Sequence, residues 1–236
     1  MTLEALGIDV SRYNGLVSWQ VAKDNLVVFA GIRASISWGY RDPFGLYNMA
    51  ECRKAGIFQL PYHVLYPGEN AIRQADNYLA ITEDWTGAAP VLDLELDHNY
   101  SRITITTCAI AWCERVKQVT GKDPIVYSRA GWINEHTTTG AWRNEYDWWL
   151  ADYLGDRTQE QEEPPIKPTG VNTWLIHQTA DKITAWPGLN GPGGISTVDY
   201  NRWNGDAIAV GDYFGANPPE GVIICPRCGH GWIPNE

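Results

Sequence analysis

The chain has 236 residues, with 18 Lys and Arg against 28 Asp and Glu, which gives a formal net charge of −10. Hydrophobic residues make up 44% and charged residues 19%, which is typical of a globular protein and excludes wholesale disorder. No apolar run approaches the roughly 20 residues that a membrane-spanning helix needs. The acidic balance argues against nucleic acid as a partner, and against anionic lipid or wall polymers held by bulk charge. We therefore expect binding to come from a shaped site.

Short apolar runs recur along the chain and are separated by longer connecting segments. Near-continuous apolar runs of this length are typical of parallel strands that are buried on both faces. We expect eight strands, at residues 5–10, 27–34, 59–65, 91–96, 124–129, 147–153, 173–179 and 196–201.

The connections change in character along the chain. The first four predict helices, at residues 17–25, 45–55, 69–81 and 101–119, and the last of these has Ser101 as a suitable N-terminal cap. Residues 131–139 have room for about two helical turns. Residues 159–170 and 181–194 are too rich in Pro and Gly for a long helix. The second of these links leaves open an antiparallel pairing of the strands that it joins.

This order of elements predicts an α/β fold, an irregular (β/α)8-like barrel of the TIM type with reduced helices in its second half. A doubly wound open sheet is disfavoured, because the Gly-rich residues 191–194 lack the helix and the Lys of a phosphate-binding loop. We expect residues 1–214 to form a catalytic barrel, with the short segment 207–215 covering one barrel end. Residues 215–236 are expected to form a Pro/Gly-rich tail.

Four of the eight expected strands carry a carboxylate inside or at the end of an apolar run. These carboxylates are Asp9, Asp93 with Glu95, Asp152 and Asp199. A carboxylate in such a run is costly unless it is paired or functional. Catalytic residues of TIM-type barrels lie at the carboxyl ends of the strands. We expect strands one, four and eight to be neighbours in the closed barrel, so that their carboxylates converge on one site.

Among these carboxylates, Asp93 and Glu95 give the clearest indication of a catalytic pair. Residues two apart on a strand point to the same face, with Cα atoms about 6.5 Å apart, and two carboxylates this close raise one pKa. A carboxyl that stays protonated near neutral pH can act as a general acid, and paired carboxylates carry out glycoside hydrolysis. Two plainer interpretations stay open at this point: a salt-bridged rim, or a cation site made of oxygen ligands.

Several of these segments together resemble glycoside hydrolase family 25, the Chalaropsis-type lysozymes (N-acetylmuramidases). They are residues 7–15 (GIDVSRYNG), 29–35 (FAGIRAS), 42–43 (DP), 54–65 (KAGIFQLPYHVL), 90–96 (PVLDLEL), 124–129 (PIVYSR), 148–153 (WWLADY), 176–180 (IHQTA) and 198–205 (VDYNRWNG). The resemblance covers about residues 5–206. It implies a barrel with reduced helices that hydrolyses the β-1,4 bond between N-acetylmuramic acid and N-acetylglucosamine in bacterial peptidoglycan, as a phage-type endolysin does.

Carried over by position, the resemblance implies that Glu95 is the general acid that protonates the leaving oxygen. Asp93 would assist, either by orienting the substrate N-acetyl group as an internal nucleophile or by stabilising the oxocarbenium-like state. Asp9 and Asp199 would line the same cleft and tune the pKa values of the pair. Three further positions match family contacts to the sugar or its acetamido group: Tyr62, Tyr127 and Gln178.

The tryptophans and one short segment bear on the cleft wall. Trp38, Trp148 and Trp149 lie near expected strand ends, where each could stack on a sugar or pack the barrel. After the second strand the family usually shows Glu or Gln followed by Gly, whereas this chain has Ile36-Ser37-Trp38-Gly39. His63 is expected to be a buried structural group without a chemical role.

The five cysteines do not form a disulfide framework. Cys225 and Cys228 form one CxxC knuckle, with His230 nearby. This knuckle is an unmetallated turn, a structural zinc site completed by His230 or by another chain, or a redox pair. We expect no metal in the barrel and no cofactor for catalysis.

The first residues show neither a basic segment nor a long apolar segment, so no signal peptide is predicted. The chain is therefore expected to be made in a cytoplasm and to act on the cell wall after release, by phage lysis or by non-classical export. Two alternatives to a muramidase stay open. One is a non-catalytic glycan-binding barrel of a phage particle, and the other is a glycosidase that acts on another N-acetylated glycan. The four carboxylates argue against the first.

Overall fold

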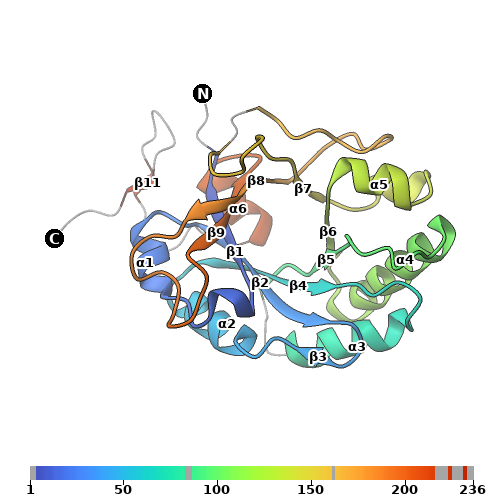
Figure 1. Cartoon of the computed structure of the whole chain (residues 1–236), viewed down its shortest axis with the longest axis horizontal. Coiled ribbons are helices and arrows are strands. Elements are labelled where there is room, and N and C mark those ends of the chain that lie inside the picture. Colours follow the sequence, from blue (N-terminus) through green and yellow to red (C-terminus); the bar gives the residue numbers. More distant parts are fainter. Residues whose placement is uncertain (1–3, 83–86, 161–162, 216–222, 225–230, 233–236) are drawn as a thin grey trace.

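The computed structural model describes residues 4–82, 87–160 and 163–215, together with the backbone of 223–224 and 231–232. In this part of the chain, nine strands form one sheet, and all of them except β3 close into a barrel (Figure 1). In order around the barrel, the strands are β1 (Leu6–Val10), β9 (Thr197–Trp203), β8 (Ile176–Thr184), β7 (Trp148–Ala151), β6 (Ile125–Ser128), β5 (Val91–Asp93), β4 (Phe58–Val64) and β2 (Phe29–Ile36), and β2 pairs again with β1. The predicted TIM-type barrel is therefore confirmed.

Two short pairings lie outside the barrel. β3 (Tyr40–Arg41) folds back on the end of β2 as an antiparallel strand, with Tyr40 opposite Ile36. β10 (Ile223–Ile224) and β11 (Gly231–Trp232) form a separate antiparallel pair. None of these was predicted, because two-residue strands leave no periodic signal in the sequence.

The helices follow the predicted decline along the chain. They are α1 (Trp19–Asp24), α2 (Gly45–Lys54), α3 (Ala71–Thr82), α4 (Arg102–Thr120), α5 (Ala130–His136) and α6 (Ala207–Phe214). Ser101 caps α4 by accepting a hydrogen bond from the Thr104 N–H, as predicted. Among the described residues, no helix lies between β7 and β8 or between β8 and β9. No described helix is both long and apolar enough to cross a bilayer.

β9 runs antiparallel to both of its neighbours, β8 and β1. The link between β8 and β9 has no helix to carry the chain back across the barrel, so the strand returns in the opposite direction. β8 also extends to Thr184, five residues beyond the predicted end of that strand. The reversal places the beginning of β9, rather than its end, at the barrel mouth where the parallel strands finish.

One expectation about neighbours was wrong. β5 carries Asp93, but β4 and β2 separate it from β1 on one side, and β6, β7 and β8 separate it from β9 on the other. Asp93 therefore meets the carboxylates of β1 and β9 across the barrel interior and not along the sheet. β5 also ends at Asp93, so Glu95 lies just beyond the strand.

Large aromatic rings fill the barrel interior, and the backbone approaches these rings closely. Phe29 and Trp203 pack edge to face at 5.3 Å, and both belong to one buried cluster with Trp149. An added Cβ at Gly31 would overlap the Trp149 ring and lie 2.8 Å from Cβ of Asp9. At the amino end of the strands, α6 completes this cluster, with Phe214 stacked on Phe58 at 4.7 Å.

This packing predicts the effect of a single methyl group. Gly31→Ala should lower the free energy of unfolding by about 1–3 kcal/mol, because the new side chain must displace Trp149 or Asp9. Urea unfolding followed by fluorescence measures this change. Gly131→Ala is the matched control, since an added Cβ in α5 meets nothing within 4 Å and should leave the stability equal or slightly higher. A Gly31→Ala protein as stable as the wild type would contradict the packing account.

Candidate active site

A narrow pocket of about 110 Å³ opens at the barrel end where the parallel strands finish. It is lined by Asp9, Tyr62, Val91, Asp93, Glu95, Tyr127, Trp149, Gln178 and Asp199. All eight candidate residues expected in the barrel lie around this one pocket, although they come from seven different strands and one following loop. Because the barrel is closed, strands that are not neighbours still point side chains at the same space.

Asp9 and Asp199 lie directly opposite each other on β1 and β9. Two amides bind Asp9: Gln178 Nε2 lies 2.6 Å from Asp9 Oδ2, and Asn201 Nδ2 lies 2.8 Å from the same oxygen. Burial raises the pKa of Asp9 from its ordinary value of 3.8 to about 6, and the two amide donors limit this rise. Burial and then the charge of Asp9 raise the pKa of Asp199 to about 10. Both shifts favour a proton shared by this carboxyl pair near neutral pH.

Gln178 connects this pair to two tyrosines. Its Oε1 accepts a hydrogen bond from the Tyr127 hydroxyl at 2.8 Å and another from the Tyr153 hydroxyl. Its Nε2 donates to Asp9 and, at 3.3 Å, to Asp199. With every polar atom engaged, the amide orientation is fixed and so is the position of the Asp9 carboxylate.

Asp93 and Glu95 face this pair from β5 and the residues after it. Burial raises the pKa of Asp93 well above its usual range, the charges of Glu95 and Asp9 add to the rise, and Arg33 opposes it. Asp93 Oδ1 is buried without a hydrogen-bond partner among the described residues. Burial also raises the pKa of Glu95, and Arg129 opposes that rise. Asp93 therefore lines the pocket with one buried oxygen that has no hydrogen-bond partner among the described residues.

The two adjacent tryptophans of β7 point to opposite faces of the strand, as the alternation of side chains along a strand requires. Trp149 is 2% exposed, forms the pocket floor against Tyr127 at 5.5 Å, and donates its indole N–H to Asn201 Oδ1 at 2.7 Å. The adjacent Trp148 points outward, where its indole N–H donates to the Arg143 carbonyl at 2.7 Å. Trp148 is therefore a packing residue, and the sugar-stacking alternative for it was wrong.

His63 is buried outside the pocket, as expected. Its ring nitrogens lie 2.7 Å from Ser35 Oγ and 3.3 Å from Gln74 Oε1, and its ring stacks on Trp112. Burial lowers the pKa of His63 to about 3, so the ring stays neutral and serves the structure.

Four residues of the site were not foreseen: Tyr153, Asn201, Arg33 and Arg129. Asn201 had a readable signal, because it lies two residues after Asp199 and so shares its face of the strand. Tyr153 and the two arginines contribute because they lie close to the site in three dimensions, and no sequence pattern predicts this proximity.

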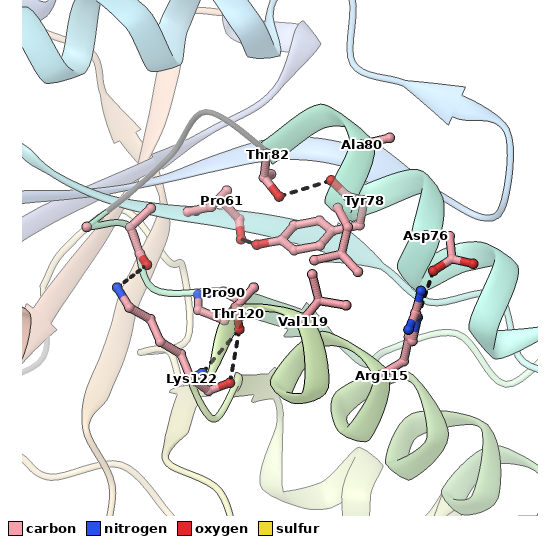
Figure 2. Close-up of a pocket in the computed structure, with 13 residues that line it drawn as sticks. Pro61, Asp76, Tyr78, Ala80, Thr82, Pro90, Arg115, Val119, Thr120 and Lys122 are labelled. Atoms are coloured by element: carbon pink, nitrogen blue, oxygen red, sulfur yellow. Dashed lines mark hydrogen bonds and ion pairs between the residues drawn. The ribbon is translucent and has the colours of Figure 1, made fainter.

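A second cavity, of about 600 Å³, lies between α3 and α4 at the amino ends of β5 and β6 (Figure 2). Among the described residues that line it, Asp76 is the one acidic side chain, and Arg115 pairs with it at 2.8 Å. The Tyr78 hydroxyl donates to the Pro61 carbonyl at 3.0 Å, and Lys122 Nζ donates to the Ala88 carbonyl at 2.9 Å. Asp76, Arg115, Tyr78 and Lys122 thus each have a partner within the protein, and we assign no acid or base to this cavity.

Metal binding can be assessed only for the described residues. Among them, no group of three or more His, Cys, Asp or Glu side chains is placed to hold a metal ion. Cys225, Cys228 and His230, the predicted knuckle, lie outside the described residues. The described cysteines, Cys52, Cys108 and Cys113, are buried free thiols, as expected.

The buried carboxyls predict how stability depends on pH. A carboxyl whose pKa is raised by folding holds its proton in the folded state at a pH where the unfolded chain has released it. The free energy of unfolding should therefore fall as pH rises from about 4, through the pKa of Asp9 near 6, toward that of Asp199 near 10. Asp199→Asn should reduce the decline between pH 4 and pH 8 by at least about 2 kcal/mol.

Chemical unfolding at several pH values measures this slope. Asp212→Asn, at an exposed position on α6, is the matched control and should keep the wild-type slope. The account of the pair would be wrong if Asp199→Asn unfolded with the same pH dependence as the wild type.

Comparison with known proteins agrees with this geometry. The family described as "Glycosyl hydrolases family 25" matches residues 8–186. The uncharacterized protein YegX of Escherichia coli (strain K12) is 34% identical over 205 residues, which are 84% of this chain and 69% of that protein. Lysozyme M1 of Streptomyces globisporus is 29% identical over 219 residues, 86% of this chain and 69% of that protein.

The fold comparison leads to the same family. The crystal structure of the bacterial lysozyme from Streptomyces coelicolor matches with a TM-score of 0.74 and 25% identity, covering 89% of this chain and 96% of that one. The family match spans more than half of the chain, including Asp9, Asp93, Glu95 and Gln178. The chain therefore belongs to glycosyl hydrolase family 25.

Proposed function

We propose that this glycoside hydrolase is a muramidase, which cleaves the β-1,4 bond between N-acetylmuramic acid and N-acetylglucosamine in bacterial peptidoglycan. One observation carries the proposal: four carboxyls with raised pKa values line a single pocket, and two of them, Asp93 and Glu95, stand together on one side. A proton donor beside a second carboxyl is what hydrolysis of a glycosidic bond requires. The non-catalytic alternative is disfavoured, because a binding module has no use for a proton held at neutral pH.

In this proposal, Glu95 is the general acid that protonates the leaving oxygen. Glu95 lies at the mouth of the pocket and is more accessible than Asp93, so it can reach the bond to be cleaved. In the unliganded site, the deeper burial of Asp93 favours the shared proton there. A substrate acetamido N–H donated to the Asp93 carboxylate would favour its ionised form, and the proton would then be held by Glu95.

Asp93 then acts on the reacting sugar. Its ionised carboxylate would either orient the acetamido group as an internal nucleophile or stabilise the positive charge that develops at the anomeric carbon. Both roles need the carboxylate to face the sugar from the β5 side.

Asp9, Asp199 and Gln178 position the substrate and set the charge of the pocket. The Gln178 amide and the Tyr127 hydroxyl form one hydrogen-bonded unit that fixes the pocket wall formed by β6 and β8. Trp149 provides the apolar floor on which a sugar ring can rest. The proposed chemistry uses these side chains and water and requires no cofactor.

We further propose that the substrate is met in the cell wall after release from the cytoplasm. This route remains a prediction, as does the division into a barrel of residues 1–214 and a tail of residues 215–236. The three interpretations of the CxxC knuckle in that tail, an unmetallated turn, a structural zinc site or a redox pair, also stay open.

Replacing the proposed acid tests the mechanism. Glu95→Gln should keep the fold and lower kcat on peptidoglycan by about 100- to 10,000-fold, because the amide cannot donate a proton to the leaving oxygen. Release of reducing ends from soluble glycan measures the rate, and thermal unfolding confirms that the protein is folded. Glu114→Gln, at an exposed position on α4, is the matched control and should keep wild-type activity. Near-normal turnover by a folded Glu95→Gln enzyme would overturn the assignment.

A further inference from the structure

Arginines and aromatic rings gather on the surface around the turn between β2 and β3. We call it the arginine–aromatic wall, and it consists of Arg12, Tyr13, Trp38, Tyr40 and Arg73. Tyr13 is 52% exposed and Trp38 is 50% exposed, and both arginines lie on the surface. None of these residues belongs to the pocket described above.

The guanidinium of Arg12 is held in place by two tyrosines. Arg12 lies in the turn that follows β1, three residues after Asp9. Its Cζ lies 4.8 Å from the centroid of the Tyr13 ring and 5.9 Å from that of Tyr40. It donates hydrogen bonds to the Tyr13 hydroxyl at 3.1 Å and to the Tyr40 hydroxyl at 3.4 Å. A planar cation fixed in this way loses less entropy when it binds a ligand.

Asp42 anchors the wall to the pocket. It accepts a hydrogen bond from the Arg12 backbone N–H at 3.0 Å and pairs with Nε of the buried Arg33 at 2.7 Å. Arg33 Cζ lies 5.6 Å from the Tyr13 ring centroid, so two arginines, Arg12 and Arg33, contact this ring. Arg33 on β2 is also paired in register with Tyr62 on β4, which lines the pocket, so Arg33 connects the wall to the pocket.

Trp38 and Arg73 form the outer part of the wall. Arg73 on α3 places its Cζ 4.6 Å from the centroid of the Trp38 ring. Asn77, also on α3, donates to the carbonyls of Ser37 and Tyr40, each at 3.3 Å, and so fixes the turn that carries Trp38.

The charges of the wall are not neutralised within the protein. Across the described residues, neither Arg12 nor Arg73 forms an ion pair with a carboxylate, although the whole chain carries a net charge of −10. Two acidic groups that contact segments of the wall are already engaged, since Asp42 binds Arg33 and Glu69 accepts a hydrogen bond from the Ser37 hydroxyl. Two exposed guanidiniums flanked by aromatic faces suit a planar anion attached to an apolar or sugar body.

We propose that the arginine–aromatic wall binds carboxylates of the peptide stem that N-acetylmuramic acid carries in peptidoglycan. This inference rests on the proposed function, because the stem leaves the glycan beside the bond to be cleaved. Arg12 pairs with a stem carboxylate near the pocket, and Arg73 pairs with one farther out. Tyr13 and Trp38 contact the apolar parts between them. Neutral sugar hydroxyls would not require two cations here.

The test compares two substrates. One is soluble, uncrosslinked glycan with peptide stems whose carboxylates are free, and the other is the same preparation with those carboxyls converted to amides. The wild type should prefer the free carboxylates by about tenfold in kcat/KM. Arg12→Gln should lower the ratio of the two kcat/KM values about three- to fivefold. Arg12→Gln combined with Arg73→Gln should bring this ratio close to one. Arg115→Gln, whose guanidinium pairs with Asp76 on the α3–α4 surface, should keep the wild-type ratio.

The outcomes separate the two proposals. Equal use of both substrates by the wild type, or an unchanged preference in the double variant, would overturn the wall as a stem site. If the wild type releases no reducing ends from either substrate, the proposed function fails. Titration with the free tetrapeptide stem then tests separately whether the wall binds stem carboxylates. A shift of the Trp38 indole N–H resonance on titration, lost in the double variant, would support the wall. No shift in the wild type would overturn it.

Discussion

Four carboxyl groups are held away from water at one end of the barrel, and the rest of the site is arranged around the cost of burying them. A buried carboxylate without partners is strongly unfavourable. The molecule lowers this cost in three ways: the Asp9–Asp199 pair retains a proton, Asp9 receives amide hydrogen bonds, and the arginines Arg33 and Arg129 oppose the rise in the pKa of Asp93 and Glu95. What remains is a pocket that holds protons at neutral pH beside an unsatisfied oxygen of Asp93. This is an arrangement that favours proton donation to a bound glycan.

The closed barrel is what makes this concentration possible. Strands from opposite sides of the sheet turn Asp9, Asp93 and Asp199 toward one space, while Trp149 seals that space from below. The antiparallel β9 is essential to the geometry, because its reversal places Asp199 opposite Asp9 at the mouth. Gly31 keeps the backbone of β2 close to both Asp9 and Trp149, so the packing of the interior and the position of a site carboxylate are linked.

The sequence predicts the strands well, because buried parallel strands are continuous apolar runs, and it predicts the site because carboxylates within such runs stand out. It does not predict which strands are neighbours across the barrel, since register and closure depend on contacts far apart in the chain. The expected adjacency of Asp9 and Asp93 was wrong for this reason. Strand alternation places Trp148 and Trp149 on opposite faces of β7, but it does not say which of the two faces the barrel interior. The contributions of Tyr153 and Arg33 depend on hydrogen bonds and distances that composition and spacing do not carry.

The position of the cut tests the central claim most directly. Purified peptidoglycan is digested with the enzyme, the products are reduced with borohydride, and the new reducing ends are identified by mass spectrometry. Cleavage by a muramidase leaves N-acetylmuramic acid at the reducing end, so the account predicts its reduced form. Reduced N-acetylglucosamine would show that the barrel cleaves the other glycosidic bond. The absence of new reducing ends, across several wall types between pH 4 and 8, would contradict the assignment of Glu95 and Asp93 to catalysis.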